Sequence, residues 1–202
     1  MVYSGKVFFF TFCAGVIIGY LCAIFFVTLS LAAPISFRRS SGDHTFNIVN
    51  NCPESITVYV KDTKCGYSPR CSDASSYSAA QPGAIPAGGS ATVTIPASWV
   101  GRIYAESSSS SCGATGEECT VGEFNLDTGD TYAQQAYDIS NIQGFTQAMS
   151  ISFDGCDEVA CSSASCACTD AYPPGDETGC GNDSPVRACG AGAIPATITF
   201  CP

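Results

Sequence analysis

The stretch Gly122–Phe153 reads GEFNLDTGDTYAQQAYDISNIQGFTQAMSISF. Apolar and polar side chains alternate along three of its parts, Glu123–Leu126, Tyr137–Ser140 and Met149–Phe153. A period of two places successive side chains on opposite faces of a β-strand, and the segments between these parts contain Gly, Asp and Asn, which favour turns. The stretch therefore predicts three short strands, each with one apolar and one polar face.

The same alternation continues outward in both directions along the chain. Gly, Pro, Ser and Asn separate the apolar segments, and the three-four spacing of an amphipathic helix does not replace the alternation. Many short strands joined by turns predict an all-β fold, a β-sandwich of two packed sheets. The further predicted strands are Thr45–Ile48, Ile56–Val60, Ala91–Ile95, Arg102–Ala105 and Thr197–Phe200.

Size and charge exclude several classes of function. The chain has 202 residues, of which 46% are hydrophobic and 13% are charged, which is typical of one globular domain. Its 8 Lys and Arg residues against 18 Asp and Glu residues give a formal net charge of −10. Nucleic-acid binding and attraction to anionic lipid both require basic residues, so neither nucleic acid nor a membrane surface is an expected partner.

The N-terminal segment predicts export. Val7–Ala33 is uncharged and apolar, and Lys6 is the only positive residue before it. The small residues in Ser30-Leu31-Ala32 suit signal-peptidase cleavage, which predicts a signal peptide over 1–32 and a secreted protein, extracellular or in the cell wall. A retained signal anchor is the alternative, because the apolar run is long enough to cross a bilayer core of about 30 Å.

A second cleavage is expected downstream of the signal peptide. Arg38 and Arg39 form a dibasic pair that a secretory convertase would cut, and the alternative is a solvated pair. Cleavage there predicts a propeptide over 33–39 and a domain over 40–202, which we expect to be a monomer.

Cysteine usage agrees with an oxidising compartment. The chain has 14 cysteines, and removing Cys13 and Cys22 with the signal leaves an even number, as paired disulfides require. The segment 156–189 contains six of them and few large apolar residues, so we expect a loop region held by disulfides worth about 2–4 kcal/mol each. Zinc binding at Cys166 and Cys168 is disfavoured because the chain has one histidine, and no metal or cofactor is expected.

That histidine, His44, lies beside Asp43 at the start of the predicted domain. We expect it at the surface rather than as the base of a catalytic triad. The chain also lacks the GxSxG, P-loop and dinucleotide-binding glycine patterns.

Four separated motifs resemble the thaumatin-like protein family, in the order in which the family has them. They are the stretch Gly122–Phe153, the opening HTFNIVNNCP from His44, CTDAYPP from Cys168, and the ending ATITFCP from Ala196. The resemblance extends from His44 to Pro202, and the short 161–168 segment is similar to the small members with a reduced second domain. It implies a thaumatin-like β-sandwich with a small disulfide-rich loop region.

The resemblance also implies disulfide pairs, and proximity in sequence suggests others. The family pairs are Cys52 with Cys201, Cys156 with Cys189 and Cys161 with Cys168. The pairs expected from proximity alone are Cys112 with Cys119, Cys65 with Cys71 and Cys166 with Cys180.

Members of the family carry an acidic cleft made by one arginine, one glutamate and three aspartates. The corresponding residues here are Arg102 in GRIYAE, Glu123 in GEF, Asp138 in YDIS and Asp170 in CTDAY, with Gln143 of IQGF in the fifth position. Without the resemblance, the carboxylates are interpreted as ordinary solvent-exposed groups on a sandwich.

Two chemistries suit such a cleft. A glycosidase needs an acid and a second carboxylate roughly 5 to 9.5 Å apart. Glu123 would be the acid and Asp138 or Asp170 the second catalytic group, because the amide of Gln143 can do neither task. A saccharide-binding site needs only hydrogen-bonding groups such as Arg102 and Gln143 and an aromatic platform, for which we expect Tyr172.

The export signal and the resemblance together imply a secreted protein that binds β-1,3-glucan or another cell-wall polysaccharide through the acidic cleft. The resemblance adds antifungal activity and allows weak endo-β-1,3-glucanase activity. The alternative is a non-catalytic secreted defence or inhibitor protein that acts through protein–protein contacts.

Overall fold

The computed structural model describes residues 42–63, 73–130, 132–176, 180–181 and 183–202. The predicted signal peptide, the predicted propeptide and the Cys65–Cys71 pair lie outside these residues. Among the described residues, no helix has the length and apolar character needed to cross a membrane.

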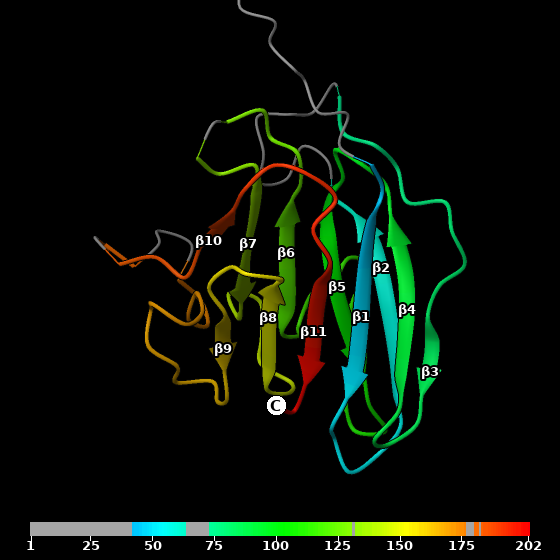
Figure 1. Cartoon of the computed structure of the whole chain (residues 1–202). Helices are drawn as coiled ribbons and strands as arrows, with labels where there is room; N and C mark the ends of the chain where they lie inside the picture. The colour runs from blue at the N-terminus through cyan, green and yellow to red at the C-terminus, as the bar shows by residue number, and fades with distance from the viewer. Residues whose placement is uncertain (1–41, 64–72, 131, 177–179, 182) are drawn as a thin grey trace, which may run out of the picture. The chain divides into compact units, whose positions relative to one another are not determined.

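The described residues form two β-sheets, as the alternation predicts (Figure 1). The first sheet has the order β4-β1-β11-β8-β9, and the second has the order β10-β7-β6-β5-β2-β3. The strands are β1 (His44–Asn50), β2 (Ile56–Asp62), β3 (Gly83–Ile85), β4 (Ser90–Ile95), β5 (Val100–Glu106), β6 (Val121–Asn125), β7 (Gln135–Ser140), β8 (Met149–Phe153), β9 (Val159–Cys161), β10 (Arg187–Cys189) and β11 (Ala196–Phe200).

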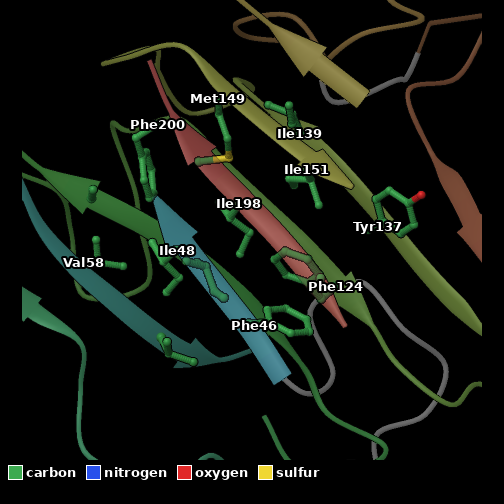
Figure 2. Close-up of a cluster of buried hydrophobic side chains, with 14 of the residues drawn as sticks. Phe46, Ile48, Val58, Phe124, Tyr137, Ile139, Met149, Ile151, Ile198 and Phe200 are labelled. Carbon is green, nitrogen blue, oxygen red and sulfur yellow. The ribbon is translucent and has the colours of Figure 1, made fainter. Parts of the chain in front are cut away.

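The two sheets pack face to face through their apolar sides (Figure 2). The Phe46 ring of β1 lies 5.1 Å from the Phe124 ring of β6, and the Tyr137 ring of β7 lies 4.7 Å from the Phe153 ring of β8. Each pair joins one sheet to the other, and all four residues are at most 3% exposed. The predicted all-β sandwich is therefore confirmed.

The two ends of the domain meet in the middle of the first sheet. β1 and β11 pair in parallel, with Phe46 opposite Ala196 and Asn50 opposite Phe200. Just beyond these strands a disulfide joins Cys52 to Cys201.

Five disulfides occur among the described residues, and three match expectation. Those three are Cys52–Cys201, Cys112–Cys119 and Cys156–Cys189. The other two differ, because the structure joins Cys161 to Cys166 and Cys168 to Cys180.

The expected Cys161–Cys168 and Cys166–Cys180 pairs are wrong because a tight turn follows β9. The Cys166 N–H donates to the Ser163 carbonyl at 3.2 Å, which returns the chain to Cys161 with a Cα–Cα distance of 5.6 Å. Cys168 is then left for Cys180.

His44 is buried, not at the surface as expected. Its Nε2 lies 3.0 Å from Asp127 Oδ2, and the residue has no exposed surface. The segment after β6 folds over the start of β1, where His44 pairs with Ile95 of β4. Burial alone would raise the pKa of Asp127. Hydrogen bonds from His44, Gln135 and the Ser98 N–H outweigh this effect and lower the pKa to about 2.

Candidate functional site

Three of the predicted site residues lie side by side on neighbouring strands of the second sheet. Arg102 of β5 is opposite Glu123 of β6, and Glu123 is opposite Asp138 of β7. Directly opposed residues project from the same face of a sheet. Phe124 and Tyr137, the next residues along, are in the core, so the three polar side chains occupy the outer face as the alternation predicts.

Arg102 and Glu123 form a buried ion pair on this face. Arg102 Nε donates to Glu123 Oε1 at 2.8 Å, and the two residues are only 4% and 8% exposed. The interpretation of Glu123 as an ordinary solvent-exposed carboxylate is therefore wrong. A buried ion pair is maintained only with good geometry and further hydrogen bonds, and Arg102 has both.

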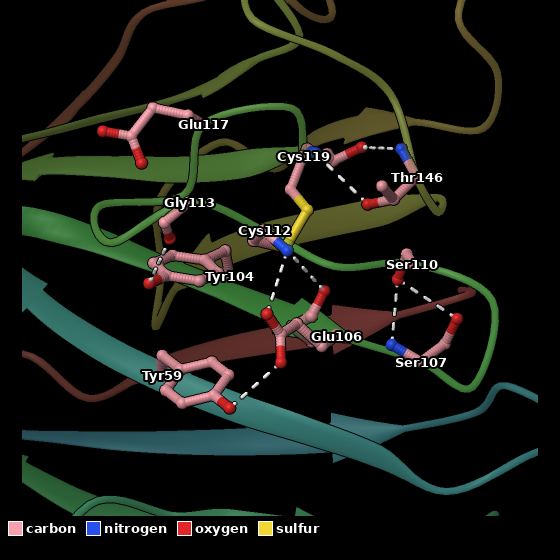
Figure 3. The surroundings of a disulfide bond; sticks show 12 residues. Tyr59, Tyr104, Glu106, Ser107, Ser110, Cys112, Gly113, Glu117, Cys119 and Thr146 are labelled. Carbon is pink, nitrogen blue, oxygen red and sulfur yellow. Dashed lines mark hydrogen bonds between the residues drawn. A yellow bond between two sulfur atoms is a disulfide. The ribbon is translucent and has the colours of Figure 1, made fainter.

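The β5–β6 loop (residues 107–120) covers this part of the sheet. The Cys112–Cys119 disulfide closes the loop, and the Tyr104 hydroxyl donates to the carbonyls of Gly113 and Ala114 (Figure 3). Arg102 Nη1 donates to the Thr115 carbonyl at 3.2 Å. Arg102 therefore joins the carboxyl groups on the sheet to the loop above them.

Glu123 and Asp138 form a coupled pair of carboxyl groups. Burial raises the pKa of Asp138 well above its usual range, and the charge of Glu123 and a hydrogen bond with Glu123 raise it further. Burial also raises the pKa of Glu123, against the opposing effects of Arg102 and of the hydrogen bond from Asp138. The raised pKa favours the protonated form of Asp138, which donates a hydrogen bond to the Glu123 carboxylate. Among the described residues, none hydrogen-bonds to Asp138 Oδ1, which is buried.

We expect Asp138→Asn to change how stability depends on pH. The native pKa of Asp138 is raised, so between the unfolded value of about 3.9 and the native value the folded state binds more protons and wild-type stability falls as pH rises. Asparagine does not titrate, so the variant gains stability relative to wild type between pH 4 and pH 7, measured by urea denaturation. The exposed Asp154→Asn controls for loss of one acidic residue. An identical pH dependence in wild type and Asp138→Asn would contradict the shared proton.

Gln143 completes the set around Arg102. It lies in the turn after β7, is exposed, and its Oε1 accepts from Arg102 Nη1 at 3.1 Å. Gly144 allows this turn to pack on the β5–β6 loop, because a Cβ at Gly144 would lie 2.4 Å from the Glu118 carbonyl oxygen. The amide oxygen of Gln143 is thus used internally, and its Nε2 is the group left for a ligand.

Tyr172 lies beside the end of β7. Its N–H donates to the Ile139 carbonyl at 3.0 Å, and its carbonyl accepts from the Asn141 N–H at 2.9 Å. Burial raises the pKa of Tyr172, against the opposing effect of a hydrogen bond with Ser184. The side chain is half-buried.

Among the described residues, no hydrogen bond joins Asp170 to this set. The contact of its carboxylate is with the neighbouring Thr169 hydroxyl, at 3.4 Å. Arg102, Glu123, Asp138, Gln143 and Tyr172 are brought together, and the catalytic and binding roles given to them, and to Asp170, remain predictions.

Sequence reasoning missed the contribution of the β5–β6 loop. Alternation alone gives no indication that the polar face of β5 and β6 is covered. The expected Cys112–Cys119 pair was the available signal, since it closes the loop directly after the strand that carries Arg102. Among the described residues, no group of three or more His, Cys, Asp or Glu side chains is placed to hold a metal ion.

No protein-family model matches the chain. Two cereal proteins are similar in sequence. Pathogenesis-related protein 1A/1B of Hordeum vulgare is 28% identical over 207 residues, covering 89% of this chain and 98% of the relative. Thaumatin-like protein PWIR2 of Triticum aestivum is 28% identical over 193 residues, covering 82% of this chain and 92% of the relative.

Two solved structures are similar in fold. The protein elicitor MoHrip2 from Magnaporthe oryzae has a TM-score of 0.52 and 16% identity, covering 79% of this chain and 99% of that one. The thaumatin-like xylanase inhibitor TLXI has a TM-score of 0.45 and 15% identity, covering 78% and 99%. The likeness to the elicitor agrees with the two-sheet fold, and the wheat relative supports the thaumatin-like resemblance carried by the motifs.

Proposed function

We propose that this is a secreted thaumatin-like protein that binds β-1,3-glucan of cell walls without hydrolysing it. The binding surface is formed by Gln143 and Tyr172, above the buried polar groups of Arg102, Glu123 and Asp138. The observation that carries the proposal is the row of Arg102, Glu123 and Asp138 on adjacent strands, with Gln143 hydrogen-bonded to Arg102 and the backbone of Tyr172 paired with the end of β7.

The exposed members supply what a neutral saccharide requires. Gln143 offers N–H donors from Nε2, and Tyr172 offers a half-buried ring and a hydroxyl. Sugar hydroxyls donate and accept hydrogen bonds, and an aromatic ring covers the C–H face of a pyranose. Arg102 and Glu123 are buried and position the others.

The charge of this cluster favours a neutral ligand. Arg102 and Glu123 offset each other, the raised pKa of Asp138 favours its protonated form, and Gln143 is an amide where acidic members of the family carry aspartate. A surface of hydrogen-bonding groups with little net charge suits a glucan better than a charged polymer.

Hydrolysis is not supported by the same geometry. Glu123 is ion-paired and shares a hydrogen bond with Asp138, whereas a glycosidase holds its two carboxyl groups roughly 5 to 9.5 Å apart with separate tasks. The pair therefore positions the surface groups instead of dividing acid and base roles. We expect no release of reducing sugar from β-1,3-glucan above a blank without protein.

Secretion and a defence role are supported by two kinds of observation. Five disulfides among the described residues fit an oxidising compartment, and the similar barley proteins are pathogenesis-related proteins. Binding to a cell wall would give such a protein its target.

The proposal is tested by a pull-down on insoluble β-1,3-glucan. We expect Gln143→Ala and Tyr172→Ala each to weaken binding about tenfold, because each removes a group worth about 1.4 kcal/mol at the surface. Tyr132→Ala, which removes a tyrosine that is 89% exposed elsewhere, and the exposed-amide variant Asn51→Ala are the matched controls. Asp170→Ala, outside the converged set, should bind like wild type.

Wild-type levels of binding by both Gln143→Ala and Tyr172→Ala would overturn the proposed surface. No binding by wild type would overturn glucan as the ligand. The protein–protein alternative then predicts capture of a secreted hydrolase by wild type and by both surface variants alike, because loop contacts elsewhere would ignore these substitutions.

A further inference from the structure

A tyrosine on the neighbouring strand is held rigidly at the same face of the sheet. The Tyr59 ring of β2 stacks on the Tyr104 ring of β5, with centroids 5.4 Å apart and planes inclined by 27° (Figure 3). Tyr104 is 2% exposed, while Tyr59 is half-buried, so Tyr59 is the outer ring of the stack. A stacked ring of this kind loses little conformational entropy when a ligand packs on it.

The hydroxyl end of Tyr59 is fixed as well. It donates to Glu106 Oε2 at 3.0 Å, and Glu106 Oε1 accepts from the Cys112 N–H at 2.9 Å. Cys112 is in turn joined to Cys119 by a disulfide. Both the face and the edge of Tyr59 are therefore set before any ligand arrives.

A cation accompanies this ring. Lys61 lies two residues further along β2, on the same face, and its Nζ is 5.7 Å from the Tyr59 ring centroid. The flexible stem of lysine lets the ammonium group move off the ring and donate up to three hydrogen bonds to a ligand.

These two residues continue the surface proposed above. Lys61 is opposite Arg102 in the sheet register, and Tyr59 is opposite Tyr104. The row Asp138, Glu123, Arg102, Lys61 therefore crosses four adjacent strands, a width of about 14 Å at the usual spacing between strands. An oligosaccharide of a few units spans that width.

The β5–β6 loop lies between the two ends of the row. Its residues Gly113, Ala114 and Thr115 are hydrogen-bonded to Tyr104 and Arg102 of β5, the strand between β2 and β6. We expect a short saccharide at Gln143 not to reach Tyr59, and a longer one to cross the loop and reach it.

We propose that Tyr59 and Lys61 form a second saccharide subsite, which binds a pyranose unit of the glucan chain held at Gln143 and Tyr172. The inference rests on the proposed function. The Tyr59 ring packs on the C–H face of the pyranose, and Lys61 donates to its hydroxyl groups. The groups around the ring are polar, with Thr57 and Glu106 opposite each other in the register, which suits a sugar better than an apolar protein surface.

The subsite is tested by titrating the full protein with soluble β-1,3-glucan oligosaccharides of increasing length and measuring Kd. Wild type should bind long oligosaccharides more tightly than short ones. Tyr59→Ala should lose about three- to tenfold in affinity for the long ones and nothing for the short ones, because only the long ones reach the ring. Tyr59→Phe keeps the ring and should bind like wild type, which separates stacking from the contact with Glu106. Tyr132→Ala is the matched exposed-tyrosine control.

The outcomes distinguish the two proposals. If Tyr59→Ala binds every length as wild type does, while Gln143→Ala weakens all lengths, the second subsite is overturned and the proposed function stands. Equal weakening of all lengths by Tyr59→Ala, with the loss also seen in Tyr59→Phe, would indicate a general disturbance of the fold and overturn the subsite. No binding of any length by wild type would overturn both proposals.

Discussion

Arg102→Met should destabilise the protein by about 3–5 kcal/mol at pH 7. The substitution keeps an apolar stem but removes the guanidinium from Glu123, which is 8% exposed and then carries an unpaired buried charge. It also removes the donor to the Thr115 carbonyl and to Gln143 Oε1. Urea denaturation of wild type and variant, with the disulfides intact, measures the loss.

The pH dependence of this loss identifies its cause. Arg102 lowers the pKa of Glu123, so its removal raises that pKa further above the unfolded value of about 4.3. The charge penalty is therefore present above the raised pKa and largely absent near pH 4, where most of Glu123 is protonated in both states. The destabilisation should shrink as pH falls, leaving only the lost hydrogen bonds.

Two further variants make the result specific to the ion pair. Glu123→Gln in the Arg102→Met background should recover part of the loss at pH 7, because it removes the unpaired charge. Arg187→Met is the control, since its guanidinium donates to backbone carbonyls near the surface, including that of Thr169. Equal losses at pH 4 and pH 7, or strictly additive effects of the two substitutions, would contradict a buried charge pair at this site.

Alternation of apolar and polar residues predicted the strands that carry Arg102 and Glu123. Each of the eight strands predicted from the sequence has at least four alternating residues, and each corresponds to a strand of the structure. The strands β3, β9 and β10 have three residues each, too few to show a period of two. The predicted strand at Glu123–Leu126 ends one residue earlier, at Asn125, and Leu126 is buried beyond the strand end.

Partners within crowded loops were harder to predict than faces of strands. The segment 161–180 contains four cysteines, and their pairing depends on the turn between Ser163 and Cys166. The alternation of apolar and polar residues does not predict this turn. The burial of His44 likewise depends on Asp127, 83 residues away. Such contacts are decided by where loops fold, not by local pattern.

The candidate site contains residues on strands, which the sequence predicts well, and residues in loops, which it predicts poorly. Its three strand residues followed from alternation together with the family motifs, and their register confirms that they are neighbours. Gln143 was placed by its motif alone, but its hydrogen bond with Arg102 required the turn at Gly144 to pack on Glu118. Asp170 was placed by the same kind of motif, and its carboxylate accepts a hydrogen bond from the Thr169 hydroxyl.

The second large effect is expected where the first and last strands of the described domain are joined. Removing the Cys52–Cys201 disulfide with a double alanine substitution should destabilise the domain by about 5 kcal/mol. The bridge joins residues separated by 149 positions, and it holds together the ends of β1 and β11, which pair in parallel. Without it, the unfolded chain gains the full entropy of an open loop of that length, which folding must then overcome to form the β1–β11 pair.

A shorter bridge provides the matched comparison. Cys168 and Cys180 are separated by 12 positions, so the corresponding double alanine variant should lose about 3 kcal/mol in the same denaturation measurement. A loss at Cys168–Cys180 equal to or larger than that at Cys52–Cys201 would show that loop length does not set the ranking. The long bridge matters most because β1 and β11 are interior strands of the first sheet, so their pairing joins β4 on one side to β8 and β9 on the other.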